Sequence, residues 1–287
     1  MQGIQMTDRH DPAITGVDSH AHIFSQHLPL ARQRRYSPDY DADVRQYLAH
    51  LDRYGLSHGV LVQPSFLGTD NSYMLAALRQ HGDRLRGTAV VAPDIDDASL
   101  EVLGEAGVVG VRLNLVGQTL EDYSVAHWQH LFTRLACLGW SVEIQRTLAD
   151  LEAIIPAILE SNVAVVIDHF GLPEGGAIDA SRREHQWFLD RLREGDLWVK
   201  LSATYRSGLS LDQARASLDT LCHAFGHAER LVWGSDWPHT RFEDQTDYAS
   251  QFALLEALMP DAELRRKVLI DNPARLFMLD EQGVSPC

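Results

Sequence analysis

The chain has 287 residues, of which 45% are hydrophobic and 23% charged, a composition typical of a globular protein with a substantial core. Its 40 acidic and 25 basic residues give a formal net charge of −15, which disfavours nucleic acid or an anionic membrane as a partner, because the mean field repels both. The cysteines, Cys137, Cys222 and Cys287, are too few and too widely spaced for a disulfide framework or a Cys-x-x-Cys metal site. The polar N-terminus does not resemble a signal peptide, and no apolar run approaches the roughly 18 residues that span a membrane, so we expect a cytoplasmic protein.

Eight short apolar segments alternate with amphipathic stretches along the chain. Each segment is rich in Val, Ile and Leu, as expected for strands that are buried on both faces of a parallel sheet. We predict strands in the segments 16–24, 58–63, 85–92, 108–115, 140–146, 163–171, 197–203 and 231–238.

The stretches between these segments show helical periodicity. In 43–54, for example, Val44, Tyr47, Leu48 and Leu51 recur on one face of a helix. Helix starts are expected at 97–99 and 210–212, and a short closing helix at 272–277. Eight strand–helix units without a Gly-rich phosphate turn predict an α/β fold, a single-domain (β/α)8 TIM barrel over residues 16–280, with tails at 1–15 and 281–287.

Several polar residues fall at the carboxyl ends of the predicted strands, where active sites of such barrels lie. His20 and His22 end the first strand, His169 follows the sixth, and Asp236 ends the eighth. Alternation places Asp18 on the same face as the two histidines of the first strand. A buried aspartate requires a cation, an imidazole or a water molecule as its partner. The four residues His20, His22, His169 and Asp236 could hold one divalent cation, Zn or Mn, and the residue types alone leave open whether they do.

The motifs that carry these residues resemble the amidohydrolase superfamily, specifically its amidohydrolase 2 branch. They are VDSHAHIF at 17–24, GVRLN at 110–114, VIDHFG at 166–171, WGSDWPH at 233–239 and DNPARLF at 271–277. Further motifs resemble the 2-pyrone-4,6-dicarboxylate lactonases of that branch. These are RRYSP at 34–38, QPSFLGTDN at 63–71, and Lys-x-Ser at 200–202 followed by Arg206.

The resemblance implies a hydrolase that opens a carboxylated lactone. By resemblance, Asp236 takes a proton from the attacking water, and the three histidines polarise the substrate carbonyl or hold a cation. Arg112 and Arg206 grip carboxylates, as the guanidinium fork allows. The remaining residues that line the pocket by resemblance are Tyr36, Ser65, Thr69 and His239. The expected partner is therefore a small anionic lactone or carboxylate.

The sequence departs from the lactonase pattern at two places. A basic pair expected after GVRLNLV is replaced by Gly117–Gln118, and a pocket tyrosine on the fifth strand is replaced by Gln145. Arg146 or Arg34 could compensate for the missing charge, although alternation puts Arg146 on the face opposite Gln145.

The strand-four residues Arg112 and Asn114 offer no lysine that could bridge two metals, so a binuclear centre is not expected. Related lactonases work with or without a metal. The pyrone-lactonase motifs favour catalysis without a cofactor, with a single divalent cation as the alternative.

Three other functions remain as alternatives. The first is a metal-dependent decarboxylase of an aromatic acid, although such relatives carry Glu-x-His on the first strand and this chain has His20-Ala21-His22. The second is a lactonase for a sugar or muconolactone-type substrate. The third is a binding or scaffolding barrel, which leaves the clustered polar residues unexplained. The sequence gives no indication of the oligomeric state.

Overall fold

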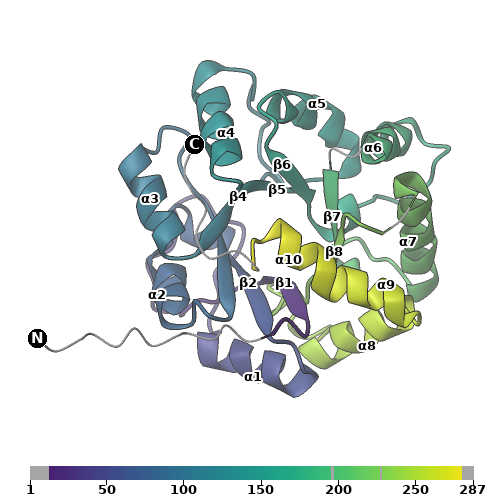
Figure 1. Cartoon of the computed structure of the whole chain (residues 1–287), viewed down its shortest axis with the longest axis horizontal. Coiled ribbons are helices and arrows are strands. Elements are labelled where there is room, and N and C mark those ends of the chain that lie inside the picture. The colour runs from purple at the N-terminus through teal and green to yellow at the C-terminus, as the bar shows by residue number, and fades with distance from the viewer. Residues whose placement is uncertain (1–12, 195–196, 227, 280–287) are drawn as a thin grey trace, which may run out of the picture.

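Eight parallel strands follow one another in chain order around a barrel, and helices surround them (Figure 1). The structure, a computed structural model, describes residues 13–194, 197–226 and 228–279. The strands are β1 (Val17–Ala21), β2 (His58–Val62), β3 (Leu85–Ala89), β4 (Val108–Asn114), β5 (Ser141–Gln145), β6 (Ala164–Ile167), β7 (Leu197–Leu201) and β8 (Leu231–Trp233). The predicted (β/α)8 barrel is confirmed. All eight strands are shorter than the predicted segments, and the polar residues that follow β1, β6 and β8 lie beyond the ladder.

Helices α1 to α8 each follow a strand and pack their apolar faces against the outer surface of the barrel, and α9 and α10 follow α8. They are α1 (Val44–Tyr54), α2 (Ser72–Gln80), α3 (Asp97–Glu105), α4 (Ala126–Cys137), α5 (Leu148–Leu159), α6 (Arg183–Arg193), α7 (Leu211–Phe225), α8 (Tyr248–Leu258), α9 (Ala262–Arg266) and α10 (Asn272–Leu276). Within the described part of the chain, no helix is both long and apolar enough to cross a membrane.

Most of the predicted helix signals are confirmed. Ser210 caps α7 and accepts from the backbone N–H of Gln213, in a capping box. The cap of α3 is Asp96, one residue before the predicted start, because its carboxylate accepts from the backbone N–H of Ser99. The predicted closing helix is α10.

Of the predicted tails, residues 1–12 and residues 281–287, which include Cys287, lie outside the described residues. Thr15 is described, and its side chain donates to the carbonyl of Gly55.

One end of the barrel is filled by apolar side chains. Helix α10 lies across the barrel in Figure 1, and Phe277, which directly follows it, packs in a buried cluster with Val17, Val60, Val166 and Val232. Val17 is the first residue of β1, so this cluster closes the amino-terminal end. The opposite end, where the strands terminate, is left for polar side chains.

The seam between β1 and β8 is held mainly by a buried carboxylate. The Asp18 side chain accepts from the backbone N–H of Ser235 at 2.8 Å, the Ser235 hydroxyl at 2.6 Å and the Tyr248 hydroxyl at 3.1 Å. Burial raises the pKa of Asp18 to about 6, and these hydrogen bonds oppose the rise. The prediction that Asp18 shares a face with His20 and His22 is wrong. The β1–β2 register shifts between Asp18 and Ala21, and such an irregularity breaks the alternation of side chains.

Beyond Asp18, the seam needs a residue without a side chain. A Cβ added at Gly234 would lie 2.5 Å from the Cβ of His20 and 2.9 Å from its backbone nitrogen. Two backbone hydrogen bonds fix the surrounding chain, from Asp236 to the His20 carbonyl at 2.8 Å and from His22 to the Trp237 carbonyl at 2.7 Å. Gly234 therefore allows β8 to approach the histidine strand closely.

We expect Gly234→Ala to lower the free energy of unfolding by about 1–3 kcal/mol, because overpacking against fixed backbone forces the two strands apart. Thermal and urea unfolding measure this loss. Gly104→Ala is the matched control, since Gly104 lies within α3 and its added Cβ would first meet Trp140 at 3.4 Å. The control should unfold at the wild-type temperature or above it, because Ala is the better helix former. Equal unfolding temperatures for Gly234→Ala and the wild type would contradict the close-approach argument.

Candidate active site

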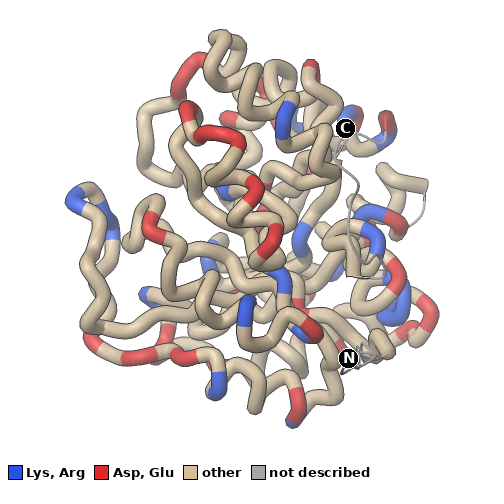
Figure 2. Tube along the Cα trace, turned by 60° about the vertical axis from the view of Figure 1, so that its left-hand side comes forward, with Lys and Arg blue, Asp and Glu red and all other residues tan. Residues whose placement is uncertain are grey.

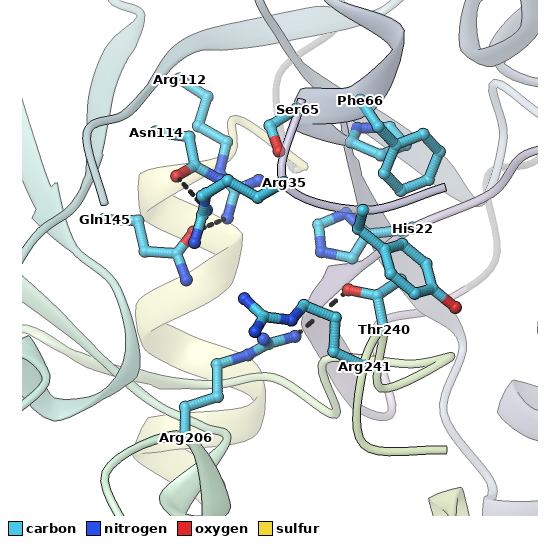
Figure 3. Close-up of a pocket in the computed structure, with 12 residues that line it drawn as sticks. His22, Arg35, Ser65, Phe66, Arg112, Asn114, Gln145, Arg206, Thr240 and Arg241 are labelled. Carbon is cyan, nitrogen blue, oxygen red and sulfur yellow. Dashed lines mark hydrogen bonds between the residues drawn. The ribbon is translucent and has the colours of Figure 1, made fainter. Parts of the chain in front are cut away.

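A pocket of about 450 Å³ opens at the end of the barrel where the strands terminate (Figure 3). None of its 12 lining residues is acidic, and four of them are arginines, namely Arg35, Arg112, Arg206 and Arg241. Figure 2 shows acidic and basic residues interspersed along the rest of the described chain. The pocket is therefore strongly cationic, although the protein as a whole carries a formal charge of −15.

The structure brings together the four residues predicted to carry the chemistry. His22 lines the pocket, and His20, His169 and Asp236 are buried beneath it. The ring of His20 lies 4.9 Å from those of both His22 and His169, measured between centroids. The Oδ1 atom of Asp236 lies 3.6 Å from His20 Nε2 and 3.4 Å from His22 Nε2.

The Asp236 carboxylate is held by one oxygen and open at the other. Its Oδ2 accepts from the Tyr205 hydroxyl at 2.5 Å and from Arg206 Nε at 2.6 Å. Its Oδ1 is buried and has no hydrogen-bond partner among the described residues. Burial alone would raise the pKa of Asp236, but the charges of Arg206 and His169 outweigh it and hold that pKa well below the usual range. The group is thus an oriented, ionised carboxylate with one oxygen free to accept a proton.

A hydrogen bond determines which nitrogen of His22 carries a proton, while His20 has contacts of both kinds. His22 Nδ1 lies 2.7 Å from the Val62 carbonyl, which only accepts, so this nitrogen is the donor. His20 Nδ1 lies 3.1 Å from Lys200 Nζ, closer than the carboxylates of Glu143 at 3.3 Å and Asp168 at 3.4 Å.

Burial and the Lys200 charge hold the pKa of His20 well below the usual range, so its ring is neutral. An ammonium group only donates and the two carboxylates only accept, so the contacts of Nδ1 are compatible with a proton on either ring nitrogen. The Nε2 atom of His20 faces Asp236 Oδ1.

Four charged side chains form a buried layer beneath the histidines, which we call the charged layer: Arg112, Glu143, Asp168 and Lys200. Lys200 donates to Glu143 and lies 3.7 Å from Asp168, while Arg112 lies 3.3 Å from Asp168 and 3.7 Å from Glu143. Burial and the nearby Asp168 raise the pKa of Glu143 to about 7, against the opposing charges of Lys200 and Arg112. Sequence reasoning gave Lys200 and Glu143 no role, although Lys200 is the one charged residue of the otherwise apolar β7 and Glu143 lies between Val142 and Ile144 on β5.

The backbone takes left-handed φ angles at several non-glycine residues of the site. These angles are +55° at His169, +59° at Asp236, +66° at His239 and +73° at Arg241. Such conformations are costly for residues with a Cβ and persist where the surrounding structure fixes them. Nothing in the sequence signals them, yet they direct the chain at the ends of β6 and β8.

The predicted pocket residues divide into two groups. Tyr36 and Ser65 line the pocket as predicted. Thr69 is exposed and is not among the lining residues. His239 is buried behind the lining, where its Nδ1 lies 3.3 Å from the hydroxyl of Tyr205, a residue that sequence reasoning missed.

Neither predicted replacement for the missing basic pair reaches the main pocket. Arg146 bonds to Asp150 and to the Leu115 carbonyl, so it points away from Gln145, as alternation indicated. Arg34 bonds to Ser37 and to the Ala31 carbonyl. The pocket instead receives Arg35 and Arg241, both of which lie in loops whose conformation the sequence did not indicate.

The chain is similar in sequence and structure to several known proteins. The chain is 33% identical to a 2-pyrone-4,6-dicarboxylate hydrolase of Comamonas testosteroni, over 92% of this chain and 90% of the relative. It is 31% identical to a 4-sulfomuconolactone hydrolase of Rhizobium radiobacter, over 91% and 89%. A candidate 2-pyrone-4,6-dicarboxylic acid hydrolase of Acinetobacter baumannii, crystallised with citric acid, superposes with a TM-score of 0.87 at 36% identity, covering 92% of this chain and 99% of that one.

The amidohydrolase family profile matches residues 17–279, which is nearly the whole described chain. This match agrees with the barrel, with the histidines and aspartate at the carboxyl ends of β1, β6 and β8, and with the similarity to the two hydrolases. The chain belongs to the amidohydrolase family.

Proposed function

We propose that the protein is a lactonase that hydrolyses the ring ester of a small lactone bearing carboxylate groups. The observation that carries this proposal is the Asp236 carboxylate, tethered through Oδ2 and open at Oδ1, beside a pocket lined by four arginines. The names of the relatives support the substrate class, since they hydrolyse a pyrone dicarboxylate and a sulfomuconolactone.

In the proposed reaction a water molecule lies between Asp236 Oδ1 and the lactone carbonyl carbon. Asp236 takes one proton from this water, and the water oxygen bonds to the carbonyl carbon while the carbonyl electron pair moves onto oxygen. His20 donates its Nε2–H to that developing oxyanion. Collapse of the intermediate breaks the bond to the ring oxygen, which receives the proton from Asp236, and the product is an open hydroxy- or keto-acid.

The tether of Asp236 fits this role as a base. A carboxylate that accepts two hydrogen bonds on one oxygen has its orientation fixed, so the other oxygen presents its lone pairs in one direction. The low pKa of Asp236 keeps it ionised throughout the neutral range, at the expense of basicity. Proximity to the bound substrate compensates for the weaker base, because a positioned water loses little entropy on attack.

The anionic substrate class follows from the pocket's charge. Arg112 and Arg206 reach the pocket but are also paired with the buried carboxylates Asp168 and Asp236. A substrate carboxylate that enters the pocket meets guanidinium donors with no competing carboxylate in its lining. The same field attracts a small anion despite the negative charge of the whole protein.

The donor atoms of the site could hold a metal by distance alone. Two sets of three groups have their atoms within 4.8 Å of one another, one comprising His20, His22 and Asp236 and the other His20, Asp168 and His169. Both sets include His20, whose Nδ1 lies 3.1 Å from Lys200 Nζ and whose Nε2 carries the proton in the tautomer that accepts from Lys200. A protonated nitrogen cannot ligate a metal ion.

The charge balance also disfavours a divalent cation. Glu143, Asp168 and Asp236 are balanced by Arg112, Lys200 and Arg206. A divalent ion would add two positive charges to this balanced set, beside the further charges of Arg35 and Arg241. We therefore propose that Lys200 provides the cationic charge beneath His20 and that the reaction requires no metal.

We expect Asp236→Asn to lower kcat on 2-pyrone-4,6-dicarboxylate by about 10²–10⁴-fold, because the amide keeps the shape of the side chain but cannot accept a proton from water. Loss of the pyrone absorbance measures the rate, and circular dichroism checks the fold. Asp94→Asn removes one carboxylate from an exposed turn and should retain the wild-type rate. An Asp236→Asn variant as active as the wild type on every lactone would exclude the base assignment. Release of CO2 from an aromatic acid without any lactone turnover would favour a decarboxylase instead.

Removal of divalent metals should leave the activity unchanged. Protein dialysed against a chelator, with metal content checked by mass spectrometry, is expected to open the lactone at the rate of untreated protein, and added Zn²⁺ or Mn²⁺ should not increase that rate. Activity that is lost with the metal and restored by either ion would refute the proposed role of Lys200.

A further inference from the structure

Two arginines at the pocket mouth lack an acidic partner. The Arg35 guanidinium donates to Asn114 Oδ1 at 3.0 Å, and the Arg241 guanidinium donates no hydrogen bond to any of the described residues. Over residues 13–194, 197–226 and 228–279, no carboxylate oxygen lies within 4.0 Å of either guanidinium. By contrast, Arg112 and Arg206 each pair with a buried carboxylate. Arg35 and Arg241 are therefore the pocket cations without an acid partner in the described chain.

Both arginines are exposed to solvent at the pocket mouth, and both lie near the other cations of the pocket. Partial burial and the positive charges of Arg241, Arg112 and Arg206 lower the pKa of Arg35. Arg241 has the left-handed φ of +73°, which disfavours a residue with a Cβ. Figure 3 shows both side chains directed into the pocket from separate loops. Like charges that converge on one pocket mouth, one of them from a strained backbone position, favour the binding of an anion between them.

A single carboxylate joins the loops that carry these arginines. Glu243 Oε1 accepts from the hydroxyls of Tyr36 at 2.5 Å and Tyr40 at 2.8 Å, and from the backbone N–H of Arg241 at 3.0 Å. Tyr36 directly follows Arg35, so Glu243 connects the loop between β1 and α1 with the loop between β8 and α8.

The first of these loops is also anchored at its base and along its length. Phe24 and Ala42 exchange backbone hydrogen bonds at 2.8 and 2.9 Å, which closes the base of the loop. The aliphatic part of Arg35 lies beside Gly117, since a Cβ added there would be 3.7 Å from Arg35 Cδ. Arg35 thus lies next to Gly117–Gln118, the position where the lactonase pattern predicted a basic pair.

We propose that Arg35 and Arg241 form an anion subsite at the pocket mouth that binds a second carboxylate of the lactone, and that Glu243 positions this pair. The assignment rests on the proposed lactonase function and deepens it, because it restricts the preferred substrates to lactones with two carboxylates. The carboxylate nearer the reacting ester is left to Arg112 and Arg206. Arg35 and Arg241 then discriminate between dicarboxylates and monocarboxylates without contacting the reacting atoms.

The test measures binding of benzene-1,3-dicarboxylate and of benzoate to the full chain by calorimetry, since neither compound contains an ester to hydrolyse. Arg35→Met and Arg241→Met should each weaken the dicarboxylate by about tenfold, the effect of losing one charge-assisted hydrogen bond, and change benzoate by less than about twofold. Arg32→Met removes the same charge three residues away, from an exposed position that does not line the pocket, and should change neither affinity. Equal losses for the dicarboxylate and benzoate, or an equal loss in Arg32→Met, would overturn the subsite.

Glu243 is tested by a pair of variants. Glu243→Ala keeps both arginines but removes the acceptor that joins their loops, so we expect it to weaken the dicarboxylate several-fold and leave benzoate nearly unchanged. Glu243→Gln retains an amide oxygen and should restore much of the affinity. Failure of Glu243→Gln to bind better than Glu243→Ala, with both variants folded, would exclude positioning through this acceptor.

Turnover separates this proposal from the proposed function. On 2-pyrone-4,6-dicarboxylate the two arginine variants should raise KM and leave kcat within about twofold, because binding to a remote group is uniform between ground and transition states. If the wild-type protein opens no lactone, but the arginine variants lose its selective binding of the dicarboxylate, the lactonase function is refuted and the subsite stands. If the wild-type protein opens the lactone, but the arginine variants bind the dicarboxylate as well as the wild type does, the subsite is refuted and the lactonase function stands.

Discussion

Compensation of three buried carboxylates is the constraint on which the site depends. Glu143, Asp168 and Asp236 are all essentially inaccessible to solvent, and an isolated ionised carboxylate in such a place would cost several kcal/mol. Lys200, Arg112 and Arg206 compensate them through direct contacts. Because each cation contacts at least one of these carboxylates, removing any member leaves an opposite charge uncompensated. The set therefore behaves as one unit, and its geometry holds the histidines above it.

This unit also determines the protonation of the site. Lys200 contacts His20 and helps to keep its ring neutral, and Arg206 fixes both the orientation and the ionisation of Asp236. The site therefore combines an ionised carboxylate at Asp236 with a neutral imidazole at His20.

The sequence predicted the barrel and the four central residues because both depend on local patterns. Apolar segments of regular spacing define the strands, and parallel strands bring their carboxyl ends to one edge, so His20, His22, His169 and Asp236 had to meet. Contacts between distant segments were not accessible in this way. Glu143 and Lys200 lie on β5 and β7, which are not adjacent strands, and their pairing depends on strand tilt across the barrel.

Other residues escaped prediction because loop conformation decided their positions. The backbone path between β1 and α1 brings Arg35 to the pocket and leaves Arg34 outside it. After β8, the left-handed φ of Arg241 accompanies its entry into the same pocket. Asp18 was misplaced because an irregular register interrupts β1. In each case the local direction of the backbone decides where a charged side chain lies.

The seam at Asp18 has a consequence for the order of assembly. Asp18 and Ser235 are separated by 217 positions in the chain, and the same seam brings His20 beside Asp236. Contacts over such long separations form late, since the intervening chain must first be ordered. During synthesis the first strand therefore leaves the ribosome long before its partner exists, and its histidines remain without their aspartate. Hydrolytic activity therefore requires the closed barrel, and partly folded chains that retain most of their helices are inactive.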